Sequence, residues 1–190
     1  MSRPNLGKVR EFLNLIRNRL PGRSEILSVF GVIVFICHSW TMLGFLNKLS
    51  SFLLYFNIGE ILSIFAYMMA FAFLESLAFT GILVLLSAIL PSAWLKEGFD
   101  VKGFVVVTIA VLTFLLLQTF LGTQYPSTLM ILLGVLAPLV LIALAIFVVQ
   151  SRPKLRSVLL NIQDRFLIML FIYAPLGILS LVVVLFRILV

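Results

Sequence analysis

Hydrophobic residues along the chain are grouped into five long runs that short polar segments separate. The runs cover about 26–46, 60–90, 103–121, 127–150 and 166–188. A helix needs roughly 20 apolar residues to cross the hydrocarbon core of a bilayer, and each of these runs is about that long or longer. The runs are apolar on every side, whereas strands of a membrane β-barrel alternate apolar and polar residues. The pattern predicts an all-α, polytopic membrane bundle with about five transmembrane helices.

The amino-acid composition supports the same class of protein. Hydrophobic residues make up 63% of the 190 residues and charged residues only 11%, which is too little polar surface for a soluble domain. The chain has one cysteine and one histidine, so an internal disulfide is impossible and a metal site would be poorly supplied with ligands. We therefore expect no metal and no cofactor.

Basic residues lie beside alternate ends of the five runs. The segment before the first run holds six of them, the connection between the second and third runs holds two, and the connection between the fourth and fifth holds four. Only Lys48 and Arg187 lie on the other side. This bias predicts a cytoplasmic N-terminus and an external C-terminus, in a bacterial or archaeal cytoplasmic membrane. The net charge of +7 then indicates membrane orientation and not binding to nucleic acid.

The first 24 residues resemble a membrane-surface segment in their pattern. Apolar residues recur at helical spacing over 5–20, with basic residues mainly on the other faces, before Pro21 and Gly22 interrupt the helix. We expect 1–24 to be a cytoplasmic basic amphipathic segment and 25–190 to be a single transmembrane domain. The side chains expected to contact anionic lipid headgroups are Arg10, Arg17, Arg19, Arg152, Lys154 and Arg156.

The apolar region 49–90 is too long for a single crossing. As one helix it would extend for roughly 60 Å, about twice the hydrocarbon thickness. The tripeptide Asn57-Ile58-Gly59 offers a break. We expect 49–57 to lie at the outer interface or to re-enter the membrane, and 60–90 to cross as a long, tilted helix.

One carboxylate, Glu75, falls near the middle of the second run. A charged side chain at that depth costs a few kcal/mol on insertion scales, so we expect Glu75 to be protonated or to have a partner. At 100° per residue, one sector of about 120° collects polar and small residues, and we expect this face to point into protein. Its members are Glu60, Ser63, Tyr67, Glu75, Ala78 and Gly81.

Two interpretations of Glu75 are open at this point. It is either a proton- or ion-responsive group on a transport path or a structural hydrogen-bonding group that joins helices or subunits. His38 and Gln118 are candidate partners, and a His38–Glu75 pair could relay a proton, although a lone histidine is commonly structural. Glu60 and Glu75 lie about 22 Å apart along a helix, too far for a catalytic carboxylate pair.

Two further features concern helix shape and enzymatic chemistry. Pro138 and Pro175 fall within the fourth and fifth runs and predict bends there.

One cluster of charged residues resembles the active site of a lipid-modifying enzyme more than any other part of the chain does. Its members are Lys96, Glu97, Asp100 and Lys102. The simpler interpretation is that these residues form a solvated connection between the second and third runs.

The function that we expect from these residues is not enzymatic. A small oligomeric transporter, or a subunit of a larger transport or energy-coupling complex, fits the apolar bundle with one deep acid. A structural or assembly subunit and a membrane-embedded lipid-modifying enzyme are the alternatives. The expected partners are a bilayer with anionic headgroups and either further copies of the chain or other membrane subunits.

Overall fold

The computed structural model describes residues 20–90, 95–121 and 128–189, and all of its regular elements are helices. They are α2 (Arg23–Tyr55), α3 (Ile58–Ile89), α4 (Phe99–Leu121), α5 (Thr128–Ser151) and α6 (Pro153–Leu189). Each is long and apolar enough to cross a membrane, which confirms the predicted bundle of five helices. The predicted amphipathic helix over 5–20, with Arg10, Arg17 and Arg19, lies outside the described residues.

The first helix extends further than its apolar run suggested. Residues 49–55 continue α2 to Tyr55 and form neither a separate interfacial segment nor a re-entrant one. The chain reverses at Phe56 and Asn57, close to the predicted break. Ring contacts join the two arms of this hairpin, because Phe45 packs against Phe65 with ring centroids 5.0 Å apart. Aromatic packing of this kind stabilises both helices beyond the length that a bilayer requires.

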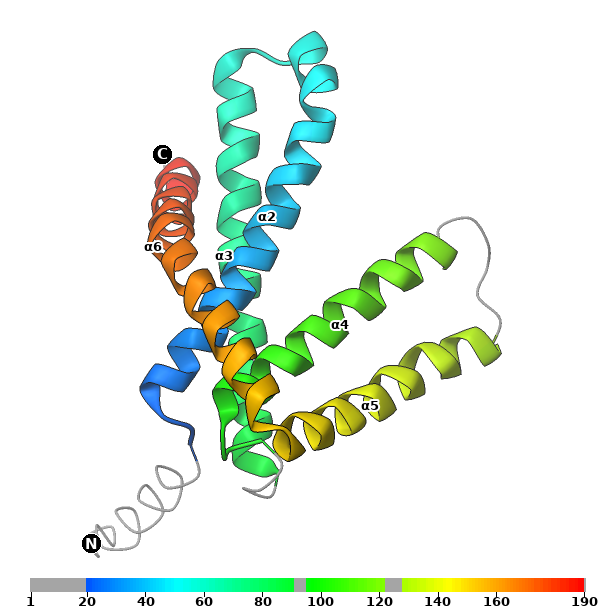
Figure 1. The fold of residues 1–190 in the computed structure, drawn as a ribbon. Coiled ribbons are helices and arrows are strands. Elements are labelled where there is room, and N and C mark those ends of the chain that lie inside the picture. Colours follow the sequence, from blue (N-terminus) through cyan, green and yellow to red (C-terminus); the bar gives the residue numbers. More distant parts are fainter. Residues whose placement is uncertain (1–19, 91–94, 122–127, 190) are drawn as a thin grey trace, which may run out of the picture.

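Helices α2, α3 and α6 form a tightly packed bundle (Figure 1). Small residues allow the backbones to approach each other closely, as is typical of membrane helices. A Cβ atom at Gly177 of α6 would lie 2.7 Å from the Cβ atom of Phe73, and one at Gly31 of α2 would lie 3.4 Å from the Cα atom of Leu167. Both glycines therefore mark contacts that a larger residue would separate.

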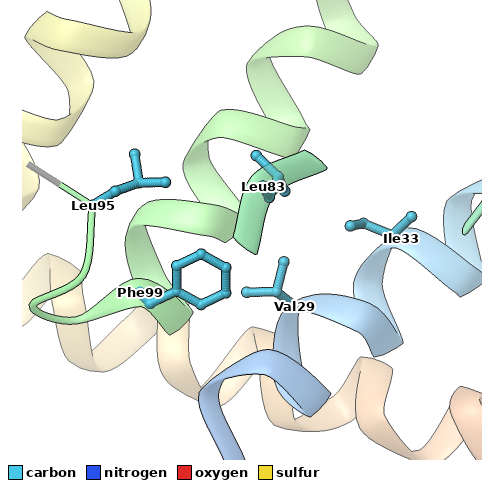
Figure 2. Close-up of a cluster of buried hydrophobic side chains, with 5 residues drawn as sticks. All are labelled: Val29, Ile33, Leu83, Leu95 and Phe99. Atoms are coloured by element: carbon cyan, nitrogen blue, oxygen red, sulfur yellow. The ribbon is translucent and has the colours of Figure 1, made fainter. Parts of the chain in front are cut away.

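The start of α4 is fixed to this bundle by a cluster of buried hydrophobic side chains (Figure 2). Its members are Val29, Ile33, Leu83, Leu95 and Phe99. Phe99 is fully buried and lies at the first residue of α4, where it meets side chains from α2 and α3. Gly103, one turn later, allows α4 to approach Val29, whose side chain would lie 2.7 Å from an added Cβ atom.

Beyond this cluster, the hairpin of α4 and α5 projects away from the other three helices (Figure 1). The apolar window of α5, Gly134–Ser151, has no buried residue within the chain. Helix α5 packs against α4 and α6, and the exposed residues of Gly134–Ser151 are available to contact lipid or another subunit. Pro138 and Pro175 lie inside α5 and α6, as predicted, and each removes one amide donor from its helix.

The helix ends follow the alternation that the basic residues predict. Figure 1 places the starts of α2 and α4 and the junction of α5 and α6 at one end of the molecule, and the turn between α2 and α3 at the other. The first of these ends is called the inner end below, because most of the basic residues lie there. That it faces the cytoplasm stays a prediction.

The close contact at Gly177 gives the first testable prediction. Gly177→Ala should destabilise the protein by about 1–3 kcal/mol, because the added methyl group overlaps Phe73 in a packed interface. Gly44→Ala on α2 is the matched control, since nothing lies within 4 Å of a Cβ atom there, and it should gain up to about 1 kcal/mol from helix propensity. Thermal unfolding in a mild detergent measures both. Equal melting temperatures for the two variants would contradict the assigned contact between α3 and α6.

Candidate functional site

The face of α3 that contains Glu75 lies on the outside of the chain. Glu75, Ala78 and Gly81 are exposed, and Ser63 and Tyr67 are only half-buried. The expectation that this polar sector points into protein is therefore wrong within a single chain. The buried face of α3 is the neighbouring one, and its polar members are Ser76, Thr80 and Ser87.

The hydroxyl groups on the buried face explain why it can pack against other helices. Ser76 Oγ donates to the Ala72 carbonyl oxygen at 2.7 Å, and Thr80 Oγ1 donates to the Ser76 carbonyl oxygen at 2.8 Å. Each hydroxyl is satisfied within its own helix, so the face behaves as a small, almost apolar surface. The Glu75 carboxylate cannot donate to a carbonyl oxygen of its own helix in this way, and it lies outside the packed face of α3.

Glu75 lies beside α2 near the middle of the 32-residue helix α3. The Cys37 thiol on α2 is hydrogen-bonded to the Ser76 side chain and lies within electrostatic reach of the Glu75 carboxylate. On α3, the flanking side chains one turn away in each direction are Phe71 and Phe79, which are 63% and 55% exposed. The carboxylate thus lies on an exposed, largely apolar surface, close to where α2 and α3 pack against each other.

His38 is one of the fully buried polar side chains of the bundle. It is fully buried, and its Nδ1 atom lies 3.0 Å from the Val34 carbonyl oxygen. A carbonyl can only accept, so Nδ1 carries the proton of this bond. The Nε2 atom is buried and has no hydrogen-bond partner, and the ring packs against Tyr173 of α6 with centroids 5.4 Å apart.

The structure does not join His38 to Glu75. His38 faces Tyr173 on α6, whereas Glu75 lies next to Cys37 on the outer flank of α3, and no hydrogen bond links the two side chains in the described part of the chain. A direct proton relay between them is therefore not formed. The α6 partner was missed by the sequence argument, because neither spacing nor composition singles out Tyr173, whose hydroxyl lies 3.4 Å from Ser39 Oγ.

Glu60 and Tyr67 both lie towards the end of the bundle opposite the inner end, which is called the outer end. They line a cavity of about 310 Å³ together with Arg187 from the last turn of α6. Glu60 has a local role there, because its Oε2 atom accepts from the Asn57 amide at 2.9 Å while Asn57 Oδ1 accepts from the Glu60 amide at 2.9 Å. This reciprocal pair is a capping box that starts α3. Gln118 is exposed near the end of α4, apart from both Glu75 and His38.

A second cavity, of about 450 Å³, lies at the inner end between α4, α5 and α6. Its lining includes Glu97, Lys102 and Arg156, while Arg152 and Lys154 are exposed outside it. Lys102 is only 6% exposed, so the interpretation of this segment as a solvated connection is wrong for that residue. Nearby, Gln163 Nε2 donates to the Asp100 carbonyl oxygen at 3.3 Å, while the buried Gln163 Oε1 has no partner.

The capping box predicts a structural role for Glu60. Glu60→Ala should lower the free energy of unfolding by about 0.5–2 kcal/mol, because the Asn57 amide loses its acceptor at the start of α3. Glu60→Gln keeps an oxygen that can accept the same bond and should change stability much less. Thermal unfolding in detergent separates the two variants. Equal destabilisation by both would show that the charge of Glu60, and not the cap, is what matters.

Chemistry that needs a metal centre gains no support from the described side chains. Among residues 20–90, 95–121 and 128–189, no group of three or more His, Cys, Asp or Glu side chains could hold a metal ion. Comparisons with protein-family models, with curated proteins and with solved structures found no match. The functional interpretation of the chain therefore depends on its own geometry.

Proposed function

We propose that the chain is a non-enzymatic membrane transport component that works as an oligomer, with Glu75 at the contact between copies as its proton-responsive group. A small oligomeric transporter and a subunit of a larger energy-coupling complex are both compatible with this role. The observation that carries the proposal is the position of Glu75, which is exposed on the outer surface of the chain near the middle of a membrane-spanning helix.

The surroundings of the Glu75 carboxyl group determine what its exposure costs in free energy. An acid at mid-membrane depth costs about 2.5–3.5 kcal/mol on insertion scales when it faces hydrocarbon. An interhelical hydrogen bond in a membrane returns about 0.6–2 kcal/mol, and burial against protein also removes the side chain from lipid. The exposed flank of α3 is therefore stabilised when another polar group covers Glu75. The Cys37 and Ser76 side chains lie on one side of it and leave the other side open.

A second copy of the same chain is the occupant that this flank fits best. A protonated carboxyl group is both a donor and an acceptor, so two Glu75 side chains related by a two-fold axis can bond to each other directly. Ala78 and Gly81 lie close to Glu75 on exposed positions, and nothing lies within 4 Å of a Cβ atom built at Gly81. These small residues permit a close approach of two α3 helices, while Phe71 and Phe79 supply apolar contact area.

The same arrangement supports a transport role over a purely structural one. A carboxyl pair in a subunit contact holds a proton that can leave only if the contact opens towards water. Gain or loss of that proton changes the charge in the contact and hence the stability of the paired state. A structural subunit would need the hydrogen bond alone, and this difference can be measured.

Cross-linking tests the contact between copies. In a Cys37→Ala background, Phe79→Cys should form disulfide-linked dimers in vesicles, because position 79 flanks Glu75 on the proposed interface. Phe171→Cys on α6 is the matched control. Gly177 packs against Phe73, and positions 171 and 79 each lie six residues inward from that contact, so they share a depth. Both phenylalanines are exposed, at 77% and 55%. Equal cross-linking at the two positions would sink the proposed interface.

Substitution of the acid itself tests the transport role. Glu75→Gln keeps a hydrogen-bonding side chain of the same size but cannot release a proton at neutral pH. We expect the oligomer to persist in mild detergent while proton flux into liposomes under an imposed potential falls at least tenfold. Flux can be followed with a pH-sensitive dye trapped inside the vesicles. An intact oligomer with unchanged flux would show that Glu75 only joins subunits, and a dispersed oligomer would equally favour the structural role.

A further inference from the structure

The cavity at the outer end combines side chains of opposite charge. It measures about 310 Å³ and lies between the first turns of α3 and the last turn of α6. Glu60 contributes a carboxylate from α3, and Arg187 contributes a guanidinium group from α6. Its other lining residues are Phe56, Ser63, Ile64 and Tyr67. Small-molecule sites in proteins commonly measure about 300–1,000 Å³, so the cavity is large enough for a small polar group.

The two charged side chains do not satisfy each other. Glu60 Oε2 accepts from the Asn57 amide, and its Oε1 atom has no hydrogen-bond partner among the described residues. The Arg187 side chain forms neither an ion pair nor a hydrogen bond with any described residue, Glu60 included. A guanidinium group has five N–H donors, and a carboxylate oxygen can accept more than one bond. The cavity therefore presents a carboxylate acceptor and a set of cationic donors for a ligand.

The charges at this end are balanced. Apart from Glu60 and Arg187, the charged residue that the described chain places there is Lys48 of α2, which is exposed and does not line the cavity. A ligand with a single charge would be attracted by one of the two lining groups and repelled by the other. A zwitterion can place its cation at Glu60 and its anion at Arg187, so both lining charges are compensated.

The depth of the cavity matches the headgroup layer of a bilayer. Along α3, Glu60 lies about 22 Å outward from Glu75, and Tyr67 lies about 12 Å outward from it. The hydrocarbon ends about 15 Å from the bilayer centre, and the headgroups extend to roughly 20–22 Å. With Glu75 near the centre, the cavity extends from the headgroups to the outer edge of the hydrocarbon. A zwitterionic lipid headgroup therefore occupies the same depth as the two charged side chains.

We propose that this cavity binds the headgroup of phosphatidylethanolamine, with the ammonium group at Glu60 and the phosphate at Arg187. The primary ammonium group has N–H donors for Glu60 Oε1, whereas the quaternary ammonium group of phosphatidylcholine has none. Arginine can donate two parallel hydrogen bonds to phosphate oxygens. Leu62 and Phe186, which are 62% and 69% exposed, adjoin lining residues in the sequence and can contact acyl chains. The inference uses the depth of Glu75 and does not depend on its role in transport.

Lipid titration followed by native mass spectrometry tests this site. The delipidated protein in detergent is titrated separately with the dioleoyl forms of phosphatidylethanolamine, phosphatidylcholine and phosphatidylglycerol. We expect one equivalent of phosphatidylethanolamine to bind about tenfold more tightly than either of the other lipids, which is the effect of one charge-assisted hydrogen bond.

Two variants and a control assign the contacts. Glu60→Gln keeps an oxygen for the capping bond but turns an amide donor towards the ammonium group, so it should weaken phosphatidylethanolamine binding about tenfold and remove the preference over phosphatidylglycerol. Arg187→Gln should weaken the binding of phosphatidylethanolamine by a similar factor. Lys48→Gln is the matched control, because it removes an exposed cation at the same end that does not line the cavity, and it should leave the affinity within about twofold.

The outcomes separate the possible explanations. Equal affinities for the three lipids, or tighter binding of phosphatidylcholine, would overturn the proposal. Equal weakening by Lys48→Gln and Arg187→Gln would show diffuse attraction to basic residues and overturn it as well. Competition by millimolar glycerophosphoethanolamine identifies a site for a soluble zwitterion, and its failure identifies the membrane lipid. Either result supports recognition of the zwitterionic headgroup once Glu60→Gln has removed the preference.

Discussion

Hydrocarbon offers no hydrogen bonds, and this constraint shapes every element of the structure. Backbone groups are satisfied inside helices, and six serine and threonine hydroxyl groups follow the same rule by donating to a carbonyl oxygen four residues earlier. The residues that do so are Ser63, Ser76, Thr80, Thr108, Thr113 and Ser151. Three groups have no such bond within their own helix. The Glu75 carboxyl faces outward, and the buried His38 Nε2 and Gln163 Oε1 atoms have no hydrogen-bond partner among the described residues.

The same constraint explains how much of the fold could be predicted from the sequence. A run of about 20 apolar residues has few alternatives to a membrane helix, and the five runs therefore identified the five helices. Helix ends were less predictable because they depend on local contacts. The continuation of α2 to Tyr55 needs the ring contacts of Phe45 with its neighbours, and no pattern within 47–55 reports them. The break at Asn57 was predictable because asparagine is a residue type that commonly caps the start of a helix, and here its Oδ1 atom accepts from the Glu60 amide.

The candidate site was harder to predict. A helical projection shows which face of a helix is polar, but it does not show which face packs against the neighbouring helices. It favoured the sector with Glu75, Ala78 and Gly81. The buried sector instead contains hydroxyls that are satisfied by their own helix, which makes them as good for close packing as alanine. The ring that packs against His38 belongs to Tyr173 on α6, 135 residues away in the sequence. Such contacts depend on how helices cross, and spacing along one helix carries no information about that.

The arrangement of the two hairpins links the inner cavity to the shape of the whole molecule. The α4–α5 hairpin is joined to the other helices mainly near the inner end, through the cluster around Phe99 and the junction with α6. Lys102, Gln150 and Arg156 come from three different helices at that junction. Since no residue of Gly134–Ser151 is buried within the chain, the contacts of α5 with α4 and α6 near this junction are among the few interactions that set the angle between the hairpin and the bundle.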